Sequence, residues 1–226
     1  MEKSALKLIS ISCLLFLASF SAKAQFMEDA NGRPLFERRY TDVQGSAYLN
    51  DNWQKGMVKL ANGQIHKNVD LKYDLVAGEL IFKSSAGAPL TFVETVKEFT
   101  LPANNDITSS GILFRSGYTP VDGAAVNTFY QVLSDGEIQL IKRSYRKVME
   151  NKPYNSATTV KTFHNASTYY IVKDGQPVKI KRDKKALLTL LGDHAPEMEN
   201  FIKANKLNFR SDADVIMLVT FYNSLK

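Results

Sequence analysis

The stretch 168-TYYIVKDGQPVKIKRDKKALLTLL-191 contains a change in hydrophobic periodicity. Up to Lys181, apolar and polar residues alternate on both sides of Asp174-Gly175, the pattern of two short strands joined by a tight turn. From Asp183 onward the leucines recur at helical spacing, and Asp183 is in position to cap a helix. The sequence therefore predicts a β-rich part that closes with this hairpin and is followed by helices.

Upstream of the hairpin, the chain consists of short runs typical of antiparallel strands. The clearest run extends from Val69 to Leu75, where apolar residues alternate with charged ones and predict one buried and one solvated face. Ala61-Asn62-Gly63-Gln64 precedes it and predicts a tight turn, because Asn-Gly readily adopts a positive φ. The predicted strands are 58–60, 69–75, 79–83, 90–92, 96–101, 111–116, 127–133, 137–148 and two strands within 168–181.

Helical signals occupy the C-terminal end. Pro196 suits the first turn of a second helix, and Ser211-Asp212-Ala213-Asp214 predicts a capping box that opens a third. Val215, Val219 and Tyr222 lie on one side of that last helix, so we expect them to pack against the sheet. The predicted fold class is α+β: a mostly antiparallel twisted β-sheet or partly closed barrel, with a C-terminal helical segment of two to three helices.

The N-terminus is typical of a secretory leader. Lys3 and Lys7 precede a short apolar run, and Ala22-Lys23-Ala24 supplies the small residues that a signal peptidase recognises. We predict that residues 1–24 are a signal peptide, cleaved after Ala24, and that the chain is exported to the periplasm, the outer membrane or the cell exterior. No later segment is long and apolar enough for a transmembrane helix, so none is expected in the mature chain.

The mature chain is expected to begin with an extended lead-in at 25–45. It continues as a single β-rich domain at 46–226, with its helices at 183–226. Cys13, the only cysteine in the sequence, lies in the predicted leader. The mature chain would therefore have no disulfide, no thiolate nucleophile and no cysteine-zinc site.

The sequence lacks the motifs of common catalytic and metal sites. His66, His164 and His194 lie in three separate segments, without a second histidine at ligand spacing. Nucleophile elbows, His-Glu-x-x-His helices and P-loops do not occur in it. We predict no catalytic residue, no metal and no cofactor. A hydrolase remains an alternative, because folding can bring together two carboxylates that are distant in the sequence.

Positive charge is concentrated in one part of the chain. Between Ile141 and Lys185 there are twelve Lys or Arg residues and three acidic ones, and acidic residues prevail in the rest of the mature chain. Such asymmetry is typical of a protein with an anionic neighbour, or of a solvated sheet face that maintains solubility. The candidate anion-contact surface consists of Lys142, Arg143, Arg146, Lys147, Lys179 and Lys181.

The arrangement of these cations depends on how the last hairpin pairs. If it lies beside the 137–148 strand, its lysines would join the others in one continuous cationic face. Alternation in the second strand of the hairpin predicts that Val178 and Ile180 are buried and the lysines exposed. Exposed aromatic rings near lysines would add stacking contacts to sugars or head groups. The candidate stacking residues are Trp53, Tyr130 and Tyr169.

Two stretches resemble uncharacterised secreted proteins of Bacteroidetes. The first, at 48–83, has a Gly-x-Val strand, then Leu-Lys-Tyr-Asp and then Glu-Leu-x-Phe. The second, at 202–226, is similar to the ends of those proteins. The resemblance implies a secreted envelope protein, and it assigns no activity and no functional residue.

These observations favour an exported, non-catalytic binding or interaction protein of the cell envelope. Its expected partners are anionic lipid head groups, an acidic glycan or an envelope protein, and not nucleic acid, because the chain is exported. One alternative is a β-barrel-like carrier of an apolar small ligand, for which an internal cavity is required. The other is a carboxylate-dependent hydrolase.

Overall fold

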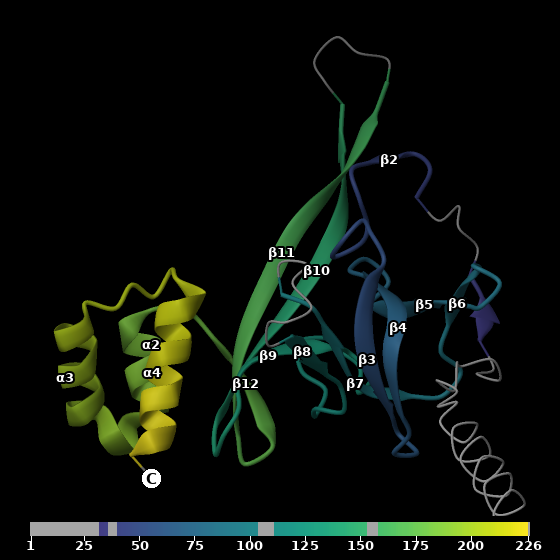
Figure 1. Cartoon of the computed structure of the whole chain (residues 1–226). Helices are drawn as coiled ribbons and strands as arrows, with labels where there is room; N and C mark the ends of the chain where they lie inside the picture. The colour runs from purple at the N-terminus through teal and green to yellow at the C-terminus, as the bar shows by residue number, and fades with distance from the viewer. Residues whose placement is uncertain (1–31, 36–39, 104–110, 153–157, 226) are drawn as a thin grey trace, which may run out of the picture.

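The computed structural model describes residues 32–35, 40–103, 111–152 and 158–225, so the predicted leader lies outside the described residues. The strands join in one sheet with the order β1-β6-β5-β4-β3-β7-β8-β9-β10-β11-β12, and β2 pairs with β11 off this path (Figure 1). All described pairings are antiparallel except that between β2 and β11. The strands are β1 Arg33–Pro34, β2 Val43–Gln44, β3 Gln54–Leu60, β4 Ile65–Asp74, β5 Glu79–Lys83, β6 Pro89–Thr91, β7 Val96–Leu101, β8 Ile112–Arg115, β9 Tyr130–Ser134, β10 Gln139–Asn151, β11 Val160–Lys173 and β12 Gln176–Ile180.

The helices follow the sheet in sequence and lie beside its β9–β12 end (Figure 1). They are α2 Lys184–Leu190, the short 3-10 helix η2 Gly192–His194, α3 Ala195–Asn205 and α4 Asp212–Ser224. Both predicted N-caps are confirmed: Asp183 accepts a hydrogen bond from the Ala186 backbone, and Ser211 accepts one from the Asp214 backbone. The return bond of a capping box is not formed, because the Asp214 carboxylate accepts from the Asn208 N–H and the Ser211 N–H donates to the Asn208 carbonyl. The α+β prediction of a mostly antiparallel sheet followed by helices is therefore confirmed.

The strand order has two free ends, β1 and β12, so the described strands form an open sheet. One backbone hydrogen bond links distant parts of it, from the Arg146 N–H to the Leu75 carbonyl at 2.9 Å. This bond brings β10 against the chain that leaves β4. The finer prediction of a partly closed barrel stays a prediction.

Helix α4 packs on the sheet through the predicted residues. Val215, Val219 and Tyr222 are fully buried and lie in one cluster with Leu140 of β10 and Ile171 of β11. The Tyr222 hydroxyl donates to the Asp193 carboxylate at 2.9 Å, so the polar end of this buried ring is satisfied. The prediction that the last helix covers the sheet is confirmed.

A second cluster fills the space between β3, β4, β5, β7 and β8. Its centre is aromatic: the Phe99 ring stacks on Phe114 with centroids 4.6 Å apart, and it meets Phe129 edge-on at 4.9 Å. Tyr73 packs against the same group with its centroid 5.3 Å from that of Phe99. Rings in offset or edge-on contact stabilise a core beyond their buried area, so this cluster fixes the β3–β8 half of the sheet.

A third cluster covers the sheet on the face opposite the helices. Tyr118, Val121 and Ala124, from the connection between β8 and β9, pack over Tyr130 and Tyr170. Because strand neighbours alternate, Tyr169 faces the helices while Tyr170 faces this third cluster. Both faces of the sheet are therefore covered at Tyr169 and Tyr170.

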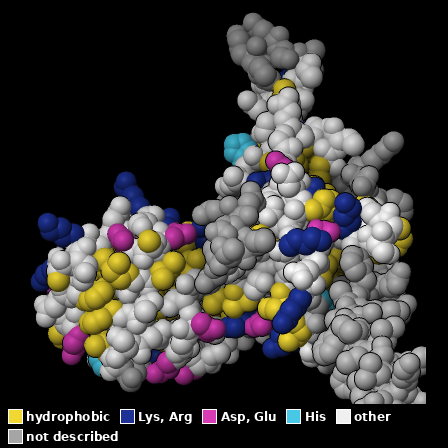
Figure 2. Space-filling model, viewed as in Figure 1, with side chains coloured by type: hydrophobic (Ala, Val, Ile, Leu, Met, Phe, Trp, Pro, Cys, Tyr) yellow, Lys and Arg dark blue, Asp and Glu magenta, His cyan; other side chains and the backbone are white. Residues whose placement is uncertain are grey.

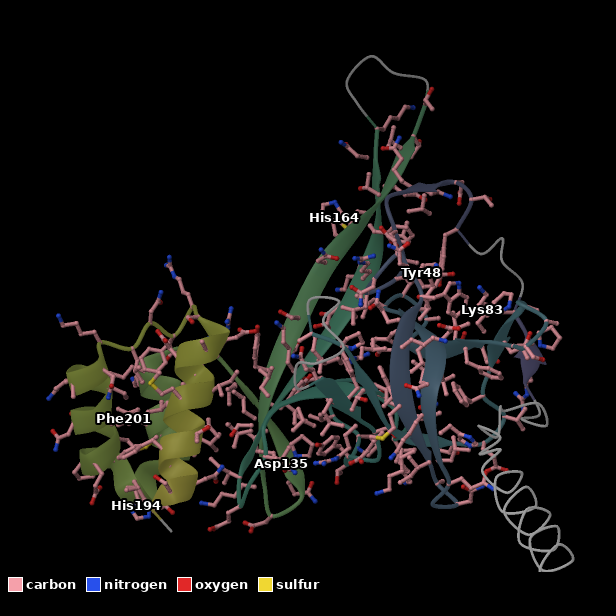
Figure 3. The ribbon with its side chains drawn as sticks, viewed as in Figure 1. Tyr48, Lys83, Asp135, His164, His194 and Phe201 are labelled. Carbon is pink, nitrogen blue, oxygen red and sulfur yellow. The ribbon has the colours of Figure 1, made fainter. Side chains whose placement is uncertain are left out.

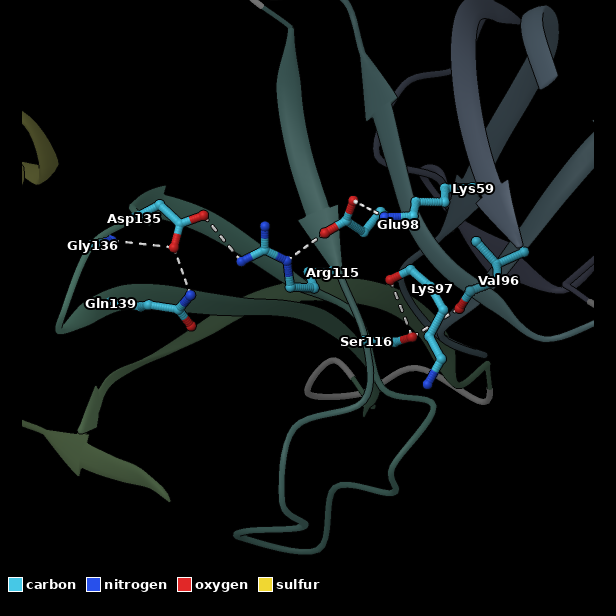
Figure 4. A network of polar contacts seen from close by, with 9 residues as sticks. All are labelled: Lys59, Val96, Lys97, Glu98, Arg115, Ser116, Asp135, Gly136 and Gln139. Atoms are coloured by element: carbon cyan, nitrogen blue, oxygen red, sulfur yellow. Dashed lines mark hydrogen bonds and ion pairs between the residues drawn. The ribbon is translucent and has the colours of Figure 1, made fainter. Parts of the chain in front are cut away.

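Charges in the β7–β9 region are neutralised by a local network, drawn in Figure 4. The Arg115 Nε donates to Glu98 at 2.6 Å, and its Nη1 donates to Asp135 at 3.1 Å. Asp135 also accepts from the Gln139 side-chain amide at 2.6 Å. Burial acts to raise the pKa of Asp135, but these donors outweigh it, so the pKa is lowered and the carboxylate stays charged.

Side chains of all types reach the surface of the helical part, where hydrophobic groups lie between charged ones (Figure 2). Phe201 and Phe221 stack there with centroids 4.0 Å apart, and Met217 is 44% exposed. Within the described ranges, no helix combines the length and apolar character that crossing a bilayer requires.

Candidate functional site on the β10–β11 ribbon

Strands β10 and β11 pair along their whole length, from Gln139–Val172 to Asn151–Val160, and we call this pair the ribbon. The ribbon extends well beyond the rest of the sheet (Figure 1). It is longer than predicted, because β11 begins at Val160 and not at Thr168. The outer half of β11 is half-buried or exposed on both sides, with no fully buried residue, so it lacks the apolar and polar alternation that identifies a half-buried strand.

Strand register places the six candidate cations on two opposite faces. Lys142, Ser144 and Arg146 lie on the face that meets the helices, which we call the helix face. Arg143, Tyr145 and Lys147 lie on the other, which we call the outer face.

The last hairpin adds its lysines to the outer face. Lys179 pairs with Tyr170, which pairs with Ile141 on the outer side of β10. Lys181 directly follows the end of β12 and is exposed, and the strand alternation, continued by one residue, assigns it to that side. The hairpin also lies beside β11 and not beside β10. The prediction of one continuous face that includes Lys142 is therefore wrong, because β10 sends neighbouring residues to opposite sides.

On the helix face, Lys142 belongs to a structural ion cluster. The Lys142 Nζ lies 2.8 Å from one Asp212 oxygen, and the other oxygen lies 2.6 Å from Arg182 Nη1 and accepts from the Tyr169 hydroxyl at 2.7 Å. Burial acts to lower the pKa of Lys142, but the interactions with Asp212 and Tyr169 together outweigh it and raise that pKa. Lys142 therefore joins β10 to the first turn of α4.

Arg146 is held by neighbours of a different kind. Its Nε donates to the Asn165 side-chain oxygen at 2.8 Å, and its Nη1 donates to the Ser46 carbonyl. This contact ties the ribbon to the segment that enters β3. Figure 3 labels Tyr48 of that segment and His164 of the ribbon. A shallow cavity of about 270 Å³ lies between Lys142 and Arg146, lined also by Ser144, Asn165, Ser167, Leu49, Leu75, Tyr145 and Ala166.

The outer face carries cations around an aromatic ring. The Arg143 guanidinium lies 5.3 Å from the Tyr145 ring centre, and the Lys147 ammonium lies 5.6 Å from it on the same strand. His164 is exposed opposite Lys147. Every outer-face position of β10 and β11 is occupied by a residue without a carboxylate.

The outer-face cations differ in how they are compensated. Lys179 lies 3.2 Å from Asp122, which also accepts from the Tyr170 hydroxyl. Burial and the negative charge of Asp122 raise the pKa of Tyr170 to about 12, so this hydroxyl remains a donor at neutral pH. Arg143, Lys147 and Lys181 have no ion pair with any residue that the structure describes.

Two of the three predicted stacking aromatics are buried. Tyr130 is 2% exposed within the third cluster, and Tyr169 is 7% exposed beneath the helices. Their prediction as exposed rings is wrong, because both faces of the sheet are covered at these positions. Trp53 is half-buried, and the Lys72 ammonium lies 5.3 Å from its ring centre. Sequence reasoning missed Tyr145, although its position two residues from Arg143 and Lys147 was a usable signal.

The edge strand β12 corrects one further prediction. Ile180 is buried, as expected, whereas Val178 is 43% exposed. Strand β12 ends the sheet, so the helices cover Ile180 and leave Val178 beyond their edge. Lys179 and Lys181 are exposed, as predicted.

Within the described ranges, no three His, Cys, Asp or Glu side chains gather in a way that would hold a metal ion. Comparison of the chain with protein-family models, with curated proteins and with solved structures found no match. The resemblance of 48–83 and 202–226 to secreted Bacteroidetes proteins stays a prediction.

Proposed function

We propose that this protein is an exported, non-catalytic binding protein of the cell envelope that contacts anionic lipid or acidic glycan through the outer face of the ribbon. The observation that carries the proposal is the charge of Arg143, Lys147 and Lys181, which form no ion pair within the described residues, beside outer-face positions of β10 and β11 that hold no carboxylate. Elsewhere in the sheet, comparable cations such as Arg115 and Lys142 are neutralised by nearby acids. Export and the envelope location rest on the predicted leader.

The chemistry of this face suits anionic partners. A guanidinium offers a planar set of donors that matches carboxylate and phosphate oxygens, and here it is held beside an aromatic ring. Lys147 adds charge at the other side of the same ring. Because the cations are exposed or half-buried, binding should depend on the summed surface potential and weaken with salt.

We also propose that the sheet is a partly closed barrel around the aromatic cluster. The hydrogen bond from Arg146 to Leu75 supports this closure. Phe99 and Phe114 lie in full contact within that space, which favours a binding surface over a carrier of apolar cargo.

The test compares retention on anionic phosphatidylglycerol vesicles and on a polyuronate resin. The variant Arg143→Gln/Lys147→Gln/Lys181→Gln should lose at least about tenfold in retention at low salt, because three uncompensated cations are removed. The matched control Lys67→Gln/Lys83→Gln/Lys97→Gln removes the same charge from exposed sites elsewhere in the sheet, and should stay within about twofold of wild type.

The two probes separate the sources of the anion. A protein specific for lipid would be retained only by the vesicles, and one specific for glycan only by the polyuronate resin. Raising the ionic strength from about 20 mM to about 300 mM should release the wild type. Equal retention of the two triple variants, or retention insensitive to salt, would contradict the proposal.

A further inference from the structure

The lining of the cavity on the helix face is rich in groups that can donate hydrogen bonds. Ser144 of β10 stands directly opposite Ser167 of β11, and neither hydroxyl bonds to another residue in the described part of the chain. The Asn165 oxygen is already engaged by Arg146, which leaves its amide N–H groups free. No carboxylate lines the cavity.

Two cations flank Ser144 along β10, and both are held in place by neighbouring residues. Lys142 and Arg146 are four residues apart on one strand, a separation of about 13 Å along it. Lys142 is fixed by Asp212, and Arg146 is fixed by Asn165 and the Ser46 carbonyl. The Arg146 guanidinium still has a terminal nitrogen without a partner among the described residues. Such a site is preorganised for a ligand rich in acceptors.

The remaining walls and the size restrict the ligand further. Leu49 and Leu75 give the cavity an apolar side, and Tyr145 also lines it. The volume of about 270 Å³ lies just below the range of drug-sized pockets, so it accommodates about one ring. A sugar ring has C–H groups for an apolar wall and hydroxyl and ether oxygens for the serines and the amide.

We infer that the helix-face cavity is a binding site for an acidic saccharide, with the ring over Leu49 and Leu75 and the carboxylate at Arg146 or Lys142. This site lies on the opposite side of β10 from the outer face, and it does not depend on the function proposed for that face.

The test measures binding of galacturonic acid, galactose and inorganic phosphate by calorimetric titration of the full chain. Galacturonic acid should bind at least about tenfold more tightly than galactose, because only the acid has a charge for the two cations. Phosphate should not displace it, since phosphate cannot use the apolar wall or span the serine pair. Absence of galacturonate binding, equal binding of galactose, or displacement by phosphate at the same concentration would overturn the inference.

Two matched double variants localise the site. Ser144→Val/Ser167→Val removes both cavity hydroxyls from positions where valine suits a strand, and should weaken galacturonate binding at least about tenfold. Thr162→Val/Thr168→Val removes two hydroxyls from the outer face of β11 and should leave galacturonate binding unchanged. Equal effects of the two variants would refute the site.

The outcomes are distinguishable from those for the outer face. The serine variant should keep retention on phosphatidylglycerol vesicles, which contain no saccharide, and Arg143→Gln/Lys147→Gln/Lys181→Gln should keep galacturonate binding. Loss of galacturonate binding in the outer-face variant would place the saccharide there and overturn the cavity assignment.

Discussion

Val219→Asp should destabilise the protein more than any other single change considered for this fold. Val219 is fully buried between α4 and the sheet, and the carboxylate would have no cation at hydrogen-bonding distance in the described cluster. Burying an unpaired charge in an apolar contact costs about 4 kcal/mol or more. In a chain of this size that loss lowers the melting temperature by roughly 10 °C or more.

Met217 provides the control on the same helix, because it is 44% exposed. Met217→Asp should shift the melting temperature by less than about 2 °C, since surface changes usually cost within about 0.5 kcal/mol. If Val219→Asp is too unstable to purify, Val219→Ala gives a measurable loss of about 2 kcal/mol from the cavity it leaves. Unchanged melting of Val219→Ala would mean that α4 does not stabilise the sheet.

Asp212→Asn should have the second largest effect, because one carboxylate serves three partners. It binds Lys142 and Arg182 and accepts from Tyr169, and it also sits in the first turn of α4. The cluster is only partly buried, so we expect a loss of about 2 kcal/mol at neutral pH, after allowance for solvent screening. Asp70→Asn is the control: it breaks an exposed pair with Lys55 and should cost less than about 0.5 kcal/mol.

Acid should remove the difference between Asp212→Asn and the wild type. Burial acts to raise the pKa of Asp212, but the hydrogen bonds from Lys142 and Tyr169 outweigh it, so the folded-state pKa is below the ordinary value. A lowered pKa contributes stability that is complete above about pH 4 and is lost as the pH falls through the folded-state value. Melting curves between pH 7 and pH 2 should converge; a constant difference would contradict the account.

Local sequence signals predicted much of the fold, because they depend on neighbouring residues. The Asp183 and Ser211 caps, the Asn62-Gly63 turn and the buried stripe of α4 all form where expected. Each arises from a contact within a few positions of the chain. These elements were sufficient to identify the α+β class.

The candidate site was predicted less well, because it depends on register and on covering layers. Lys142 and Arg143 are adjacent in the sequence, yet one meets Asp212 and the other lies over Tyr145. Tyr130 is covered by the connection before β9, which shows no regular pattern in the sequence. The cavity also requires Leu49 and Leu75 to meet the ribbon, a long-range contact that no local motif encodes.

Selective protection of lysines tests the outer-face proposal most directly. The wild type is acetylated with and without anionic vesicles or polyuronate, and the labelling of each lysine is measured by mass spectrometry. Lys147 and Lys181 should be protected by the partner, while the exposed Lys67 and Lys83 should label equally in both conditions. Equal protection of all four lysines, or protection confined to Lys67 and Lys83, would contradict binding through the outer face of the ribbon.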